Sequence, residues 1–515
     1  MTESNWFVFR VDSSNIIGTG HVIRCLTLAE KLREFGFGSV FVCKDQPGNI
    51  SNLIKEKGFE LEILPELNSK KPLGNEKPSV ENYLSDAEKT LQVIKGKVGL
   101  ASWLIVDHYN FGQEWEIKVA EVANGVMVID DLANRKHRCD ILLDQNLAAL
   151  SPGRYENLIP SYCKQLLGPK YALLQSHYGP LRKATSRLRK PVGKILVSLG
   201  GSDPDNLTRT VANLILECIT EVQLDLVVGP AFAHSDSIRR EFSKNPFVII
   251  HEGLTTLAPL MAETDLMVGT GGTSSWERLA LSVPSVTLVV ADNQRENGEW
   301  LEKLKLAKVI DCIKKFDPTM FRDALNAILN GTESLETISE VDGNGAERVA
   351  RSLLIKGVKA RKATSYDAKL LFEWANELGV RSASLNQDPI QWEAHENWLT
   401  EKLENEKECY FLIVENLEGK PVGTVRFDGN HGNWKVNFSI SKEWRGKGLG
   451  SKVLRVAIHH LLIERKCKTI IAIVKNDNFA SLRVFEKLGF SNEVSGDNQL
   501  VFFKFIPKNP RIKRA

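Results

Sequence analysis

The feature that most constrains the fold is a strand, a glycine-rich loop and a helix in direct succession. Residues 436–440 alternate as a half-buried strand does, and Gly446, Gly448 and Gly450 follow in a short loop before a helix-forming run over 451–464. Glycines allow several backbone N–H groups to turn toward one point, and the N-terminal dipole of the new helix adds to them. The pattern therefore predicts a cradle for a pyrophosphate group.

A companion pattern follows further along the chain. After an expected strand over 469–474 comes the run Lys-Asn-Asp-Asn-Phe-Ala-Ser over 475–481, and the next helix ends at Gly489-Phe490. Together the two patterns resemble the GNAT family of N-acetyltransferases. The resemblance implies an α/β acetyltransferase domain over 359–508 that uses acetyl-CoA as its co-substrate.

The same resemblance implies which residues bind CoA. Amides of the glycine loop hold the pyrophosphate, and Asn478 bonds the pantetheine arm. The strand before the loop splays from its neighbour, which frees amides for the thioester carbonyl. The expected CoA-binding residues are Ile440, Arg445, Gly446, Lys447, Gly448, Leu449, Gly450, Asn478 and Ser481.

One residue departs from the family pattern. Phe485 stands where the family usually carries a tyrosine that is thought to protonate the leaving thiolate, and the chain has no tyrosine after Tyr410. A thiol with a pKa of about 8.5 is a tolerable leaving group and can take its proton from water. We therefore expect acetyl transfer with weaker acid assistance, and CoA binding without turnover is the alternative.

A looser resemblance lies upstream of the loop. The segments 372–376, 380–381 and 392–398 resemble GNAT members that acetylate amino groups on nucleotide-linked sugars. His395 is a candidate for a substrate contact, although a histidine and tryptophans at helical spacing are also typical of simple packing.

Composition excludes several classes of protein. A formal charge of +3 over 515 residues is too small to indicate a nucleic-acid partner. Eight cysteines without a C-x-x-C pair indicate neither a disulfide framework nor a zinc site, so we expect no metal and a reducing cytoplasm. No apolar run reaches the roughly 18 residues of a membrane span, and the start lacks the basic segment of a signal peptide.

The first 345 residues repeat a pattern of strands and helices. Short β-branched runs predict buried parallel strands at 6–11, 39–43, 103–107, 126–130 and 141–144, and, after a basic stretch over 185–190, at 194–199, 224–228, 247–250, 266–268 and 285–289. The economical interpretation is two successive Rossmann-like domains, over 1–185 and 190–350, with a ligand in the cleft.

The second of these domains carries a candidate diphosphate site. Ser274 begins a helix directly after a strand and several glycines, which aims backbone amides at a diphosphate. Glu277, one turn later, is placed to accept hydrogen bonds from both ribose hydroxyls. The candidate residues are Gly271, Gly272, Thr273, Ser274, Glu277, Asn293 and Gln294. The pattern resembles the nucleotide-sugar half of MurG-like GT-B glycosyltransferases, and a structural turn is the alternative.

The order of motifs along the chain sharpens this resemblance. Gly18-x-Gly-His21-x-x-Arg24 and Asp107-His-Tyr109 precede the diphosphate motif. Over residues 5–345 the chain resembles the UDP-2,4-diacetamido-2,4,6-trideoxy-β-L-altropyranose hydrolases of pseudaminic acid biosynthesis. The resemblance implies a GT-B fold, UDP bound mainly by the second domain, and water that attacks the anomeric carbon.

His21 matches the proposed general base of these hydrolases. An imidazole with a pKa of about 6.5 is partly neutral at cytoplasmic pH and can accept the proton of the attacking water. Further candidate substrate contacts are Asp12, Gly20, Arg24, Asp107 and Tyr109. The acidic residues and the tyrosine follow strands, at the sheet edge where open α/β domains place ligands.

The two resemblances correspond to consecutive steps of one pathway. We interpret the chain as a bifunctional cytoplasmic enzyme whose C-terminal domain N-acetylates a UDP-4-amino sugar and whose N-terminal domains hydrolyse the diacetamido product. A MurG-like glycosyltransferase fused to an acetyltransferase, and a hydrolase with a non-catalytic CoA-binding module, are the alternatives. The expected partners are the UDP-sugar and acetyl-CoA, with no nucleic acid or membrane, and the oligomeric state stays open.

Overall fold

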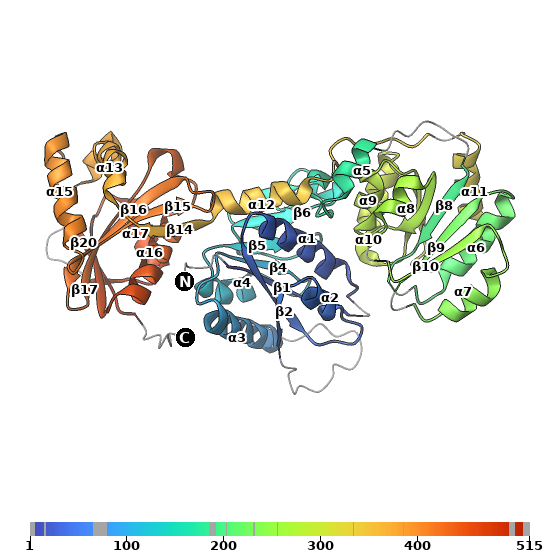
Figure 1. Cartoon of the computed structure of the whole chain (residues 1–515), viewed down its shortest axis with the longest axis horizontal. Coiled ribbons are helices and arrows are strands. Elements are labelled where there is room, and N and C mark those ends of the chain that lie inside the picture. The colour runs from blue at the N-terminus through green and yellow to red at the C-terminus, as the bar shows by residue number, and fades with distance from the viewer. Residues whose placement is uncertain are drawn as a thin grey trace. The chain divides into compact units, whose positions relative to one another are not determined.

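The computed structural model describes residues 6–14, 17–64, 80–184, 192–201, 203–229, 232–254, 256–332, 334–384, 386–493 and 500–507. The chain divides into two units, whose elements are labelled in Figure 1. The first unit extends to Arg351, and the second begins at Ser352 and includes Leu100–Trp103 and Ala123–Gly125. The basic stretches 185–190 and 508–514 lie outside the described residues.

The first unit begins with a seven-stranded sheet in the order β3-β2-β1-β4-β5-β6-β7. Its strands are β1 (Trp6–Val11), β2 (Gly38–Lys44), β3 (Glu60–Leu64), β4 (Trp103–Asp107), β5 (Val126–Ile129), β6 (Ile141–Asp144) and β7 (Lys164–Leu167). The helical elements among and after them are α1 (Gly20–Glu34), α2 (Ser51–Glu56), α3 (Val80–Lys97), α4 (Gln113–Val119), η1 (Ala120–Val122), η2 (Leu147–Leu150), η3 (Pro169–Tyr171) and α5 (Tyr178–Ala184). The strand order reverses between β1 and β4, and open α/β sheets bind ligands at the carboxyl ends of such a pair.

A second sheet of the same unit has six strands in the order β10-β9-β8-β11-β12-β13. They are β8 (Lys194–Ser198), β9 (Gln223–Val228), β10 (Val248–Glu252), β11 (Leu266–Thr270), β12 (Ser285–Val289) and β13 (Lys308–Asp311). Its helices are α6 (Leu207–Cys218), α7 (Ser235–Phe242), α8 (Ala258–Glu263), α9 (Ser274–Ala280), α10 (Asp292–Lys303) and α11 (Pro318–Leu329). The next helix, α12 (Gly345–Lys356), returns to the first sheet's domain, where Arg348 donates to the Lys170 carbonyl oxygen over 2.9 Å. The reversal in the six-stranded sheet lies between β8 and β11, so the glycine loop that follows β11 occupies the corresponding crevice.

The second unit contains a mixed sheet in the order β14-β15-β16-β17-β18-β20-β19. The strands are β14 (Val358–Lys362), β15 (Cys409–Asn416), β16 (Pro421–Asn430), β17 (Asn433–Ile440), β18 (Thr469–Lys475), β19 (Ser491–Glu493) and β20 (Leu500–Phe505). The helical elements are η4 (Ser365–Asp367), α13 (Ala368–Ala375), α14 (Leu378–Ala383), α15 (Trp392–Glu404), η5 (Lys442–Trp444), α16 (Gly450–Glu464) and α17 (Phe479–Lys487). Neighbouring strands pair antiparallel except β17 and β18, which are parallel.

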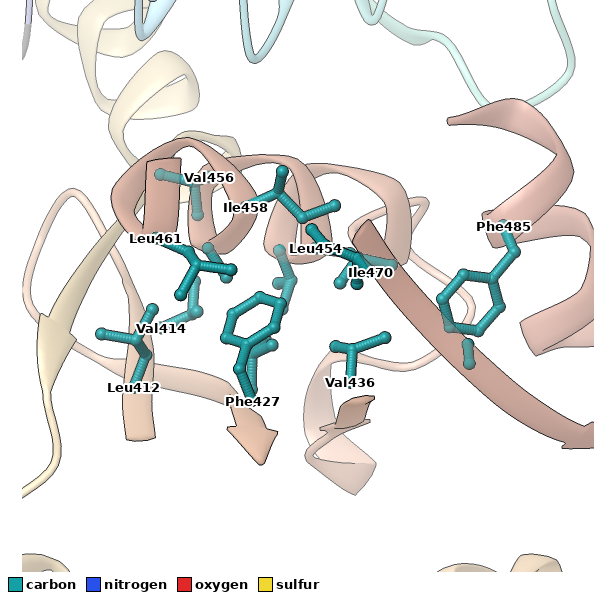
Figure 2. Close-up of a cluster of buried hydrophobic side chains, with 14 of the residues drawn as sticks. Leu412, Val414, Phe427, Val436, Leu454, Val456, Ile458, Leu461, Ile470 and Phe485 are labelled. Carbon is teal, nitrogen blue, oxygen red and sulfur yellow. The ribbon is translucent and has the colours of Figure 1, made fainter. Parts of the chain in front are cut away.

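The core of the second unit lies between α16 and the sheet. Leu454 and Leu461 of α16 point toward Leu412 and Phe427 on the strands (Figure 2), and all four side chains are fully buried. Burial of side chains of this size contributes about 1.5–3 kcal/mol each. This packing fixes the start of α16, and with it the glycine loop, against the ends of the strands.

These sheets confirm the predicted fold class. Two doubly wound parallel sheets in succession give the two Rossmann-like halves of a GT-B fold, and a separate mixed α/β domain follows them. Among the described residues, no helix is both long and apolar enough to cross a membrane.

Candidate active sites

His21 and Asp107 form the centre of the first candidate site. His21 is the second residue of α1, and Asp107 is the last residue of β4, the strand beside β1. Nδ1 of His21 lies 2.6 Å from Oδ1 of Asp107, and both side chains are buried. The fold thus joins two residues that are far apart in sequence at the carboxyl ends of adjacent strands.

Arg24 fixes the protonation of this pair. Its Nε donates to Oδ2 of Asp107 and its Nη2 to Oδ1, both over 2.6 Å. Burial alone would raise the pKa of Asp107, but Arg24 and His21 beside it hold that pKa well below its usual range. A carboxylate only accepts hydrogen bonds, so Nδ1 of His21 carries the hydrogen and Nε2 keeps its lone pair. The imidazole can therefore take a proton at Nε2.

Two contacts connect this site to the second sheet's domain. The ring of Tyr109 stands edge-on to the His21 imidazole, with 4.7 Å between the ring centres. The Tyr109 hydroxyl accepts a hydrogen bond of 3.2 Å from Nδ2 of Asn293, near the start of α10. A Cβ atom on Gly20 would lie 3.6 Å from Oγ1 of Thr273, so the two glycine-bearing loops face each other. Five residues that were predicted from the sequence thus lie close together around the His21 ring: His21 itself, Gly20, Tyr109, Thr273 and Asn293.

Asp12 lies in a second buried network. Its two oxygens accept hydrogen bonds from Arg10 over 2.6 and 2.9 Å, and Arg10 also donates to Asp86. Burial alone would raise the pKa of Asp12, but Arg10 holds it well below its usual range. A substrate contact of Asp12 therefore stays a prediction. Arg10 and Asp86 were not predicted from the sequence. The sequence does give one indication of Arg10, which is a charged residue inside the otherwise apolar strand β1.

The glycine loop after β11 is held from one side by α10. A Cβ atom on Gly271 would come within 3.2 Å of the Cβ atom of Gln294, so the loop and the helix are in close contact. Nδ2 of Asn297 donates to the Gly271 carbonyl oxygen over 3.0 Å. Thr273 occupies the N-cap position of α9, with Ser274 as the first helical residue. Gly271, Thr273, Ser274 and Gln294 thus belong to one local structure, and Asn297 was not anticipated.

Arg278, which also was not predicted from the sequence, supports this loop through several hydrogen bonds. Its Nη2 donates to the Thr270 carbonyl oxygen, to Oγ of Ser275 and to Oγ1 of Thr287, over 3.0, 3.1 and 3.1 Å. Burial lowers the pKa of Arg278 to about 10, against the opposing effect of the neighbouring carboxyl group. A Cβ atom on Gly269 would collide with the guanidinium, which explains the glycine at the end of β11.

Glu277 is half-buried on α9, beside Tyr178 and Arg278. Removal from water raises the pKa of Glu277 to about 7, although both neighbours act in the opposite direction. At neutral pH the carboxyl group is therefore divided between its protonated and charged forms. The charged form is the one that accepts hydrogen bonds from two hydroxyl groups.

The second candidate site opens where two parallel strands separate. β17 pairs with β18 only from Asn433 to Lys435, while the rest of β17 stays paired with β16. The expected divergence of the strand before the glycine loop is thus confirmed. The opening is a cavity of about 820 Å³. All of the predicted CoA-binding residues except Lys447 line it: Ile440, Arg445, Gly446, Gly448, Leu449, Gly450, Asn478 and Ser481.

Glycine is required in this loop for its backbone. Gly446 and Gly448 have φ angles of 72° and 74°, in the left-handed region that disfavours other residues, and the space where a Cβ would lie is open. Gly450 begins α16, and a Cβ there would come within 2.9 Å of Cγ2 of Val484. The N–H groups of the first turn of α16 have no intrahelical acceptor and face an anion favourably.

Asn478 is the N-cap residue of α17. Its Oδ1 accepts a hydrogen bond of 3.1 Å from the backbone N–H of Ser481. This bond fixes the rotamer of the Asn478 side-chain amide at the cavity wall. The two N–H groups of the same amide can then donate to a pantetheine carbonyl. The predicted pair Asn478 and Ser481 is therefore a single structural unit.

Arg445 and Lys447 are turned to protein groups. Arg445 forms an ion pair with Glu377, and its Nε donates to the Ile440 carbonyl oxygen over 2.9 Å. Nζ of Lys447 lies 4.9 Å from the centre of the Trp444 ring. Contacts of these two side chains with CoA stay predictions.

Phe485 of α17 lines the cavity, and its ring belongs to the buried cluster drawn in Figure 2. It is 2% exposed and packs against Phe438, Phe490 and Phe503, with ring centres 5.6, 5.0 and 5.3 Å apart. Among the described residues that line the cavity there is no tyrosine, aspartate or glutamate. At this wall, therefore, no described side chain of these types replaces the tyrosine in whose place Phe485 stands.

The cavity wall is instead strongly basic. Its charged lining residues are Arg381, Arg426, Lys435, Arg445 and Lys475. Arg426 is paired with Asp428 over 2.7 Å and Arg445 with Glu377. Within the described part of the chain, no ion pair engages the other three. The cavity therefore presents net positive charge to whatever enters it.

Nothing in the described residues is arranged as a metal site of three or more His, Cys, Asp or Glu side chains. The groups that could bind substrates are therefore hydrogen-bond donors, glycine-loop amides and cationic side chains.

Comparisons with known proteins match the two units separately. A family model described as "Acetyltransferase (GNAT) domain" matches residues 358–491. The UDP-2,4-diacetamido-2,4,6-trideoxy-β-L-altropyranose hydrolase of Campylobacter jejuni is 25% identical over 58% of this chain and 96% of its own length. An uncharacterized protein of Methanocaldococcus jannaschii is 26% identical over 95% of this chain and 98% of its own length. The crystal structure of Acinetobacter baumannii MurG covers 67% of this chain and 99% of MurG, at 15% identity and a TM-score of 0.48.

These similarities confirm both resemblances inferred from the sequence. The GNAT match coincides with the unit that contains the basic cavity, and the similarity to the hydrolase concerns the region of the two parallel sheets. The chain is thus a fusion of a region similar to that UDP-sugar hydrolase with a GNAT acetyltransferase domain.

Proposed function

We propose that the chain is a bifunctional enzyme of pseudaminic acid biosynthesis. The C-terminal domain, 359–508, transfers acetyl from acetyl-CoA to N4 of UDP-4-amino-4,6-dideoxy-N-acetyl-β-L-altrosamine. The Rossmann-like domains, 1–185 and 190–350, then hydrolyse UDP-2,4-diacetamido-2,4,6-trideoxy-β-L-altropyranose to the free sugar and UDP. All eight cysteines of the chain are free thiols in the structure. Free thiols are typical of proteins in the reducing cytoplasm, where we place this enzyme.

The observation that carries the proposal is the charge of the acetyltransferase cavity. An amine acceptor is itself cationic before reaction. Of the five basic residues that line the cavity wall, Arg426 and Arg445 are paired with carboxylates, and the other three, which have no such partner in the described part of the chain, disfavour a simple polyamine. An amino sugar attached to a diphosphate carries net negative charge and fits the same wall. The acceptor that suits this cavity is therefore the kind of compound that the hydrolase-like region handles.

The hydrolytic step uses the His21 pair. Asp107 holds Nδ1–H of His21, and Nε2 takes a proton from a water molecule as its oxygen attacks the anomeric carbon. The bond from that carbon to the UDP oxygen breaks, and UDP leaves with the bonding electrons. In our proposal Arg24 keeps Asp107 charged, and Tyr109 limits the position of the imidazole and borders the sugar.

The second Rossmann-like domain holds UDP. The N–H groups of Gly271, Gly272, Thr273 and Ser274 surround the diphosphate at the start of α9. Glu277 accepts from the ribose hydroxyls, while Asn293 and Gln294 bring α10 against the nucleotide. Asn293 also contacts Tyr109, so a nucleotide at this loop lies close to the catalytic histidine.

The acetyl step uses the glycine loop and the strand opening. Amides of Gly446 to Gly450 hold the CoA pyrophosphate, and the unpaired edge of β17 offers N–H groups to the thioester carbonyl oxygen. The amine attacks the carbonyl carbon, and the CoA thiolate leaves.

Two product analyses test the proposal. Mass spectrometry of the protein with the UDP-amino sugar and acetyl-CoA must show the acetylated UDP-sugar first and the free diacetamido sugar later. In water labelled with oxygen-18, hydrolysis at the anomeric carbon places the label in the sugar and not in UDP. A glycosyltransferase would release UDP only when an acceptor sugar or lipid is added, and a non-catalytic CoA module would leave the amine unmodified.

A further inference from the structure

A histidine is among the residues that line the acetyltransferase cavity. His395 belongs to α15 and lines the same cavity as Gly446, Gly448 and Ile440. Its side chain is almost entirely enclosed, at 2% exposure. The rings of Phe372, Trp392 and Trp398 surround it, with ring centres 5.5, 6.0 and 5.6 Å away.

One hydrogen bond fixes the tautomer of this imidazole. Nε2 of His395 lies 3.0 Å from the Ala368 carbonyl oxygen, at the start of α13. A carbonyl oxygen can only accept, so Nε2 carries the hydrogen and Nδ1 keeps the lone pair. The part of the chain that the structure describes gives Nδ1 no hydrogen-bond partner. The imidazole is thus held by one nitrogen and can accept a proton at the other.

The cavity offers no competing proton acceptor. Its other ionisable lining groups are the guanidinium and ammonium groups of Arg381, Arg426, Lys435, Arg445 and Lys475, which hold their protons at neutral pH. Enclosure by aromatic rings lowers the pKa of His395, although the carboxylate of Glu396 opposes this effect. His395 is therefore neutral at neutral pH, which is the form that accepts a proton.

The charged groups on the elements packed around the ring do not provide a fixed partner. They are Glu393, Glu396, Glu401, Lys402 and Glu404 on α15 itself, Lys369 and Glu373 on α13, Asp367 on η4 and Glu415 on β15. Lys402 is paired with Asp428, and Glu401 and Glu404 are exposed. Asp367 and Glu415 are both engaged by Arg361. Lys369, Glu373, Glu393 and Glu396 are exposed to solvent.

We propose that His395 is the general base that deprotonates the ammonium group of the acetyl acceptor. The inference rests on the acetyl transfer proposed above. The first proton passes from the ammonium nitrogen to Nδ1 of His395 and then to solvent. The nitrogen lone pair forms the bond to the thioester carbonyl carbon, the carbon–sulfur bond breaks, and the second proton on nitrogen reaches the thiolate through water. The products are the N-acetyl sugar, CoA thiol and one proton released to solvent.

The basic wall explains why such a base is needed. Neighbouring cations favour the free amine over the ammonium ion, but the described residues that line the cavity include no carboxylate to receive the ammonium proton. The nearby carboxylates of Asp428 and Glu377 are paired with Arg426 and Arg445. A neutral imidazole accepts the proton without leaving a buried carboxylate beside the anionic acceptor. His395 thus fits an acceptor that carries a diphosphate better than an acid side chain would.

The test is His395→Gln, because the side-chain amide of glutamine can still donate to the Ala368 carbonyl oxygen. We expect kcat for acetyl transfer at pH 7 to fall roughly 10²–10⁴-fold, with the dissociation constant for acetyl-CoA unchanged. The wild-type rate should fall as the pH drops and the imidazole becomes protonated. In the variant, the loss of rate that comes from protonating the imidazole disappears. The rate of the variant instead rises with pH as the free amine becomes abundant, and at high pH it approaches the rate of the wild type.

His431→Asn serves as the control, because His431 is exposed in a turn of the same domain and does not line the cavity. It should retain the wild-type rate and pH profile. A wild-type protein that never acetylates the UDP-amino sugar would refute the proposed function itself. An active wild type with an unchanged pH profile in His395→Gln would refute only the role of His395. If the variant binds acetyl-CoA more weakly than the wild type, the residue is structural and the proposal is wrong.

Discussion

Oδ1 of Asp107 lies 2.6 Å from Nδ1 of His21, and the same carboxylate accepts two hydrogen bonds from Arg24. The carboxylate therefore holds the imidazole in the tautomer that leaves Nε2 free. Against the effect of burial, Arg24 lowers the pKa of Asp107, so the carboxylate stays ionised and continues to accept from Nδ1 of His21. We therefore expect the pair to act as one catalytic unit.

The first prediction concerns this unit. His21→Asn should lower UDP release roughly 10²–10⁴-fold, because a general base acts mainly in the transition state. Asp107→Asn should lower it in the same direction. The double variant should be no slower than His21→Asn alone, because the two residues act together. Acetyl transfer by the same proteins is the internal control, and normal hydrolysis by His21→Asn would rule out this base.

The second prediction concerns Glu277. The proposed contact of Glu277 with ribose would exist in both the ground state and the transition state, so Glu277→Ala should raise KM for the UDP-sugar with kcat roughly unchanged. A fall in kcat at constant KM would instead place Glu277 at the reacting carbon.

The third prediction is a pH dependence that follows from the raised pKa of Glu277, about 7. UDP binding measured by calorimetry should strengthen as the pH rises through 7, because the charged carboxylate is the better acceptor. Stability should change the other way, because the folded protein binds more protons than the unfolded chain between the two pKa values, so stability falls as the pH rises from about 4.5 to 7. Glu277→Gln should flatten both dependences, and equal slopes in variant and wild type would contradict the assignment.

The fourth prediction separates charge from backbone strain in the CoA loop. Gly448 is in the left-handed region, which Asn and Asp tolerate better than most residues. Gly448→Asp adds a negative charge beside the pyrophosphate and should abolish acetyl-CoA binding, whereas Gly448→Asn should weaken it less. Calorimetry with acetyl-CoA compares them, and wild-type affinity in Gly448→Asp would mean that the loop does not hold the pyrophosphate.

The fifth prediction concerns Phe485. Phe485→Tyr adds a phenol with a pKa of about 10 at the cavity wall, where it can protonate the leaving thiolate. Acetyl transfer should become faster or stay level, most visibly at lower pH. Phe490→Tyr, which alters a neighbouring ring that does not line the cavity, should give no gain. A gain in Phe490→Tyr alone would contradict the expected geometry.

In the two parallel sheets of the first unit, the strands that were not predicted from the sequence share a position in the fold. β3, β7 and β13 were not predicted, and each lies at the edge of its sheet. Glu60, Lys164 and Lys308 begin these strands, and their residues are largely half-buried or exposed. An edge strand is not covered on every side, so it lacks the continuous apolar run by which central parallel strands are recognised. The central strands of these two sheets were accordingly found with small errors at their ends, whereas the central antiparallel strands β15 and β16 of the second unit were not predicted.

The candidate sites divide in a similar way. Glycine loops and strand-end residues such as His21 and Asp107 could be predicted because backbone geometry and sheet topology fix their places. Arg278 could not, because its partners are carbonyl and hydroxyl groups brought from three other positions by the fold. Of the basic wall of the acetyltransferase cavity, only Arg445 was predicted; the other four cations were missed for the same reason, since they come from separate elements.

The central claim is that one chain acetylates a UDP-linked amino sugar and then hydrolyses the product. It is tested most directly by incubating the full chain with the UDP-4-amino sugar and acetyl-CoA in water labelled with oxygen-18, and following the products by mass spectrometry. The account predicts a free sugar that carries one new acetyl group and one oxygen-18 atom, with unlabelled UDP. Free sugar without the new acetyl group, label in UDP, or no release without a further acceptor would contradict it.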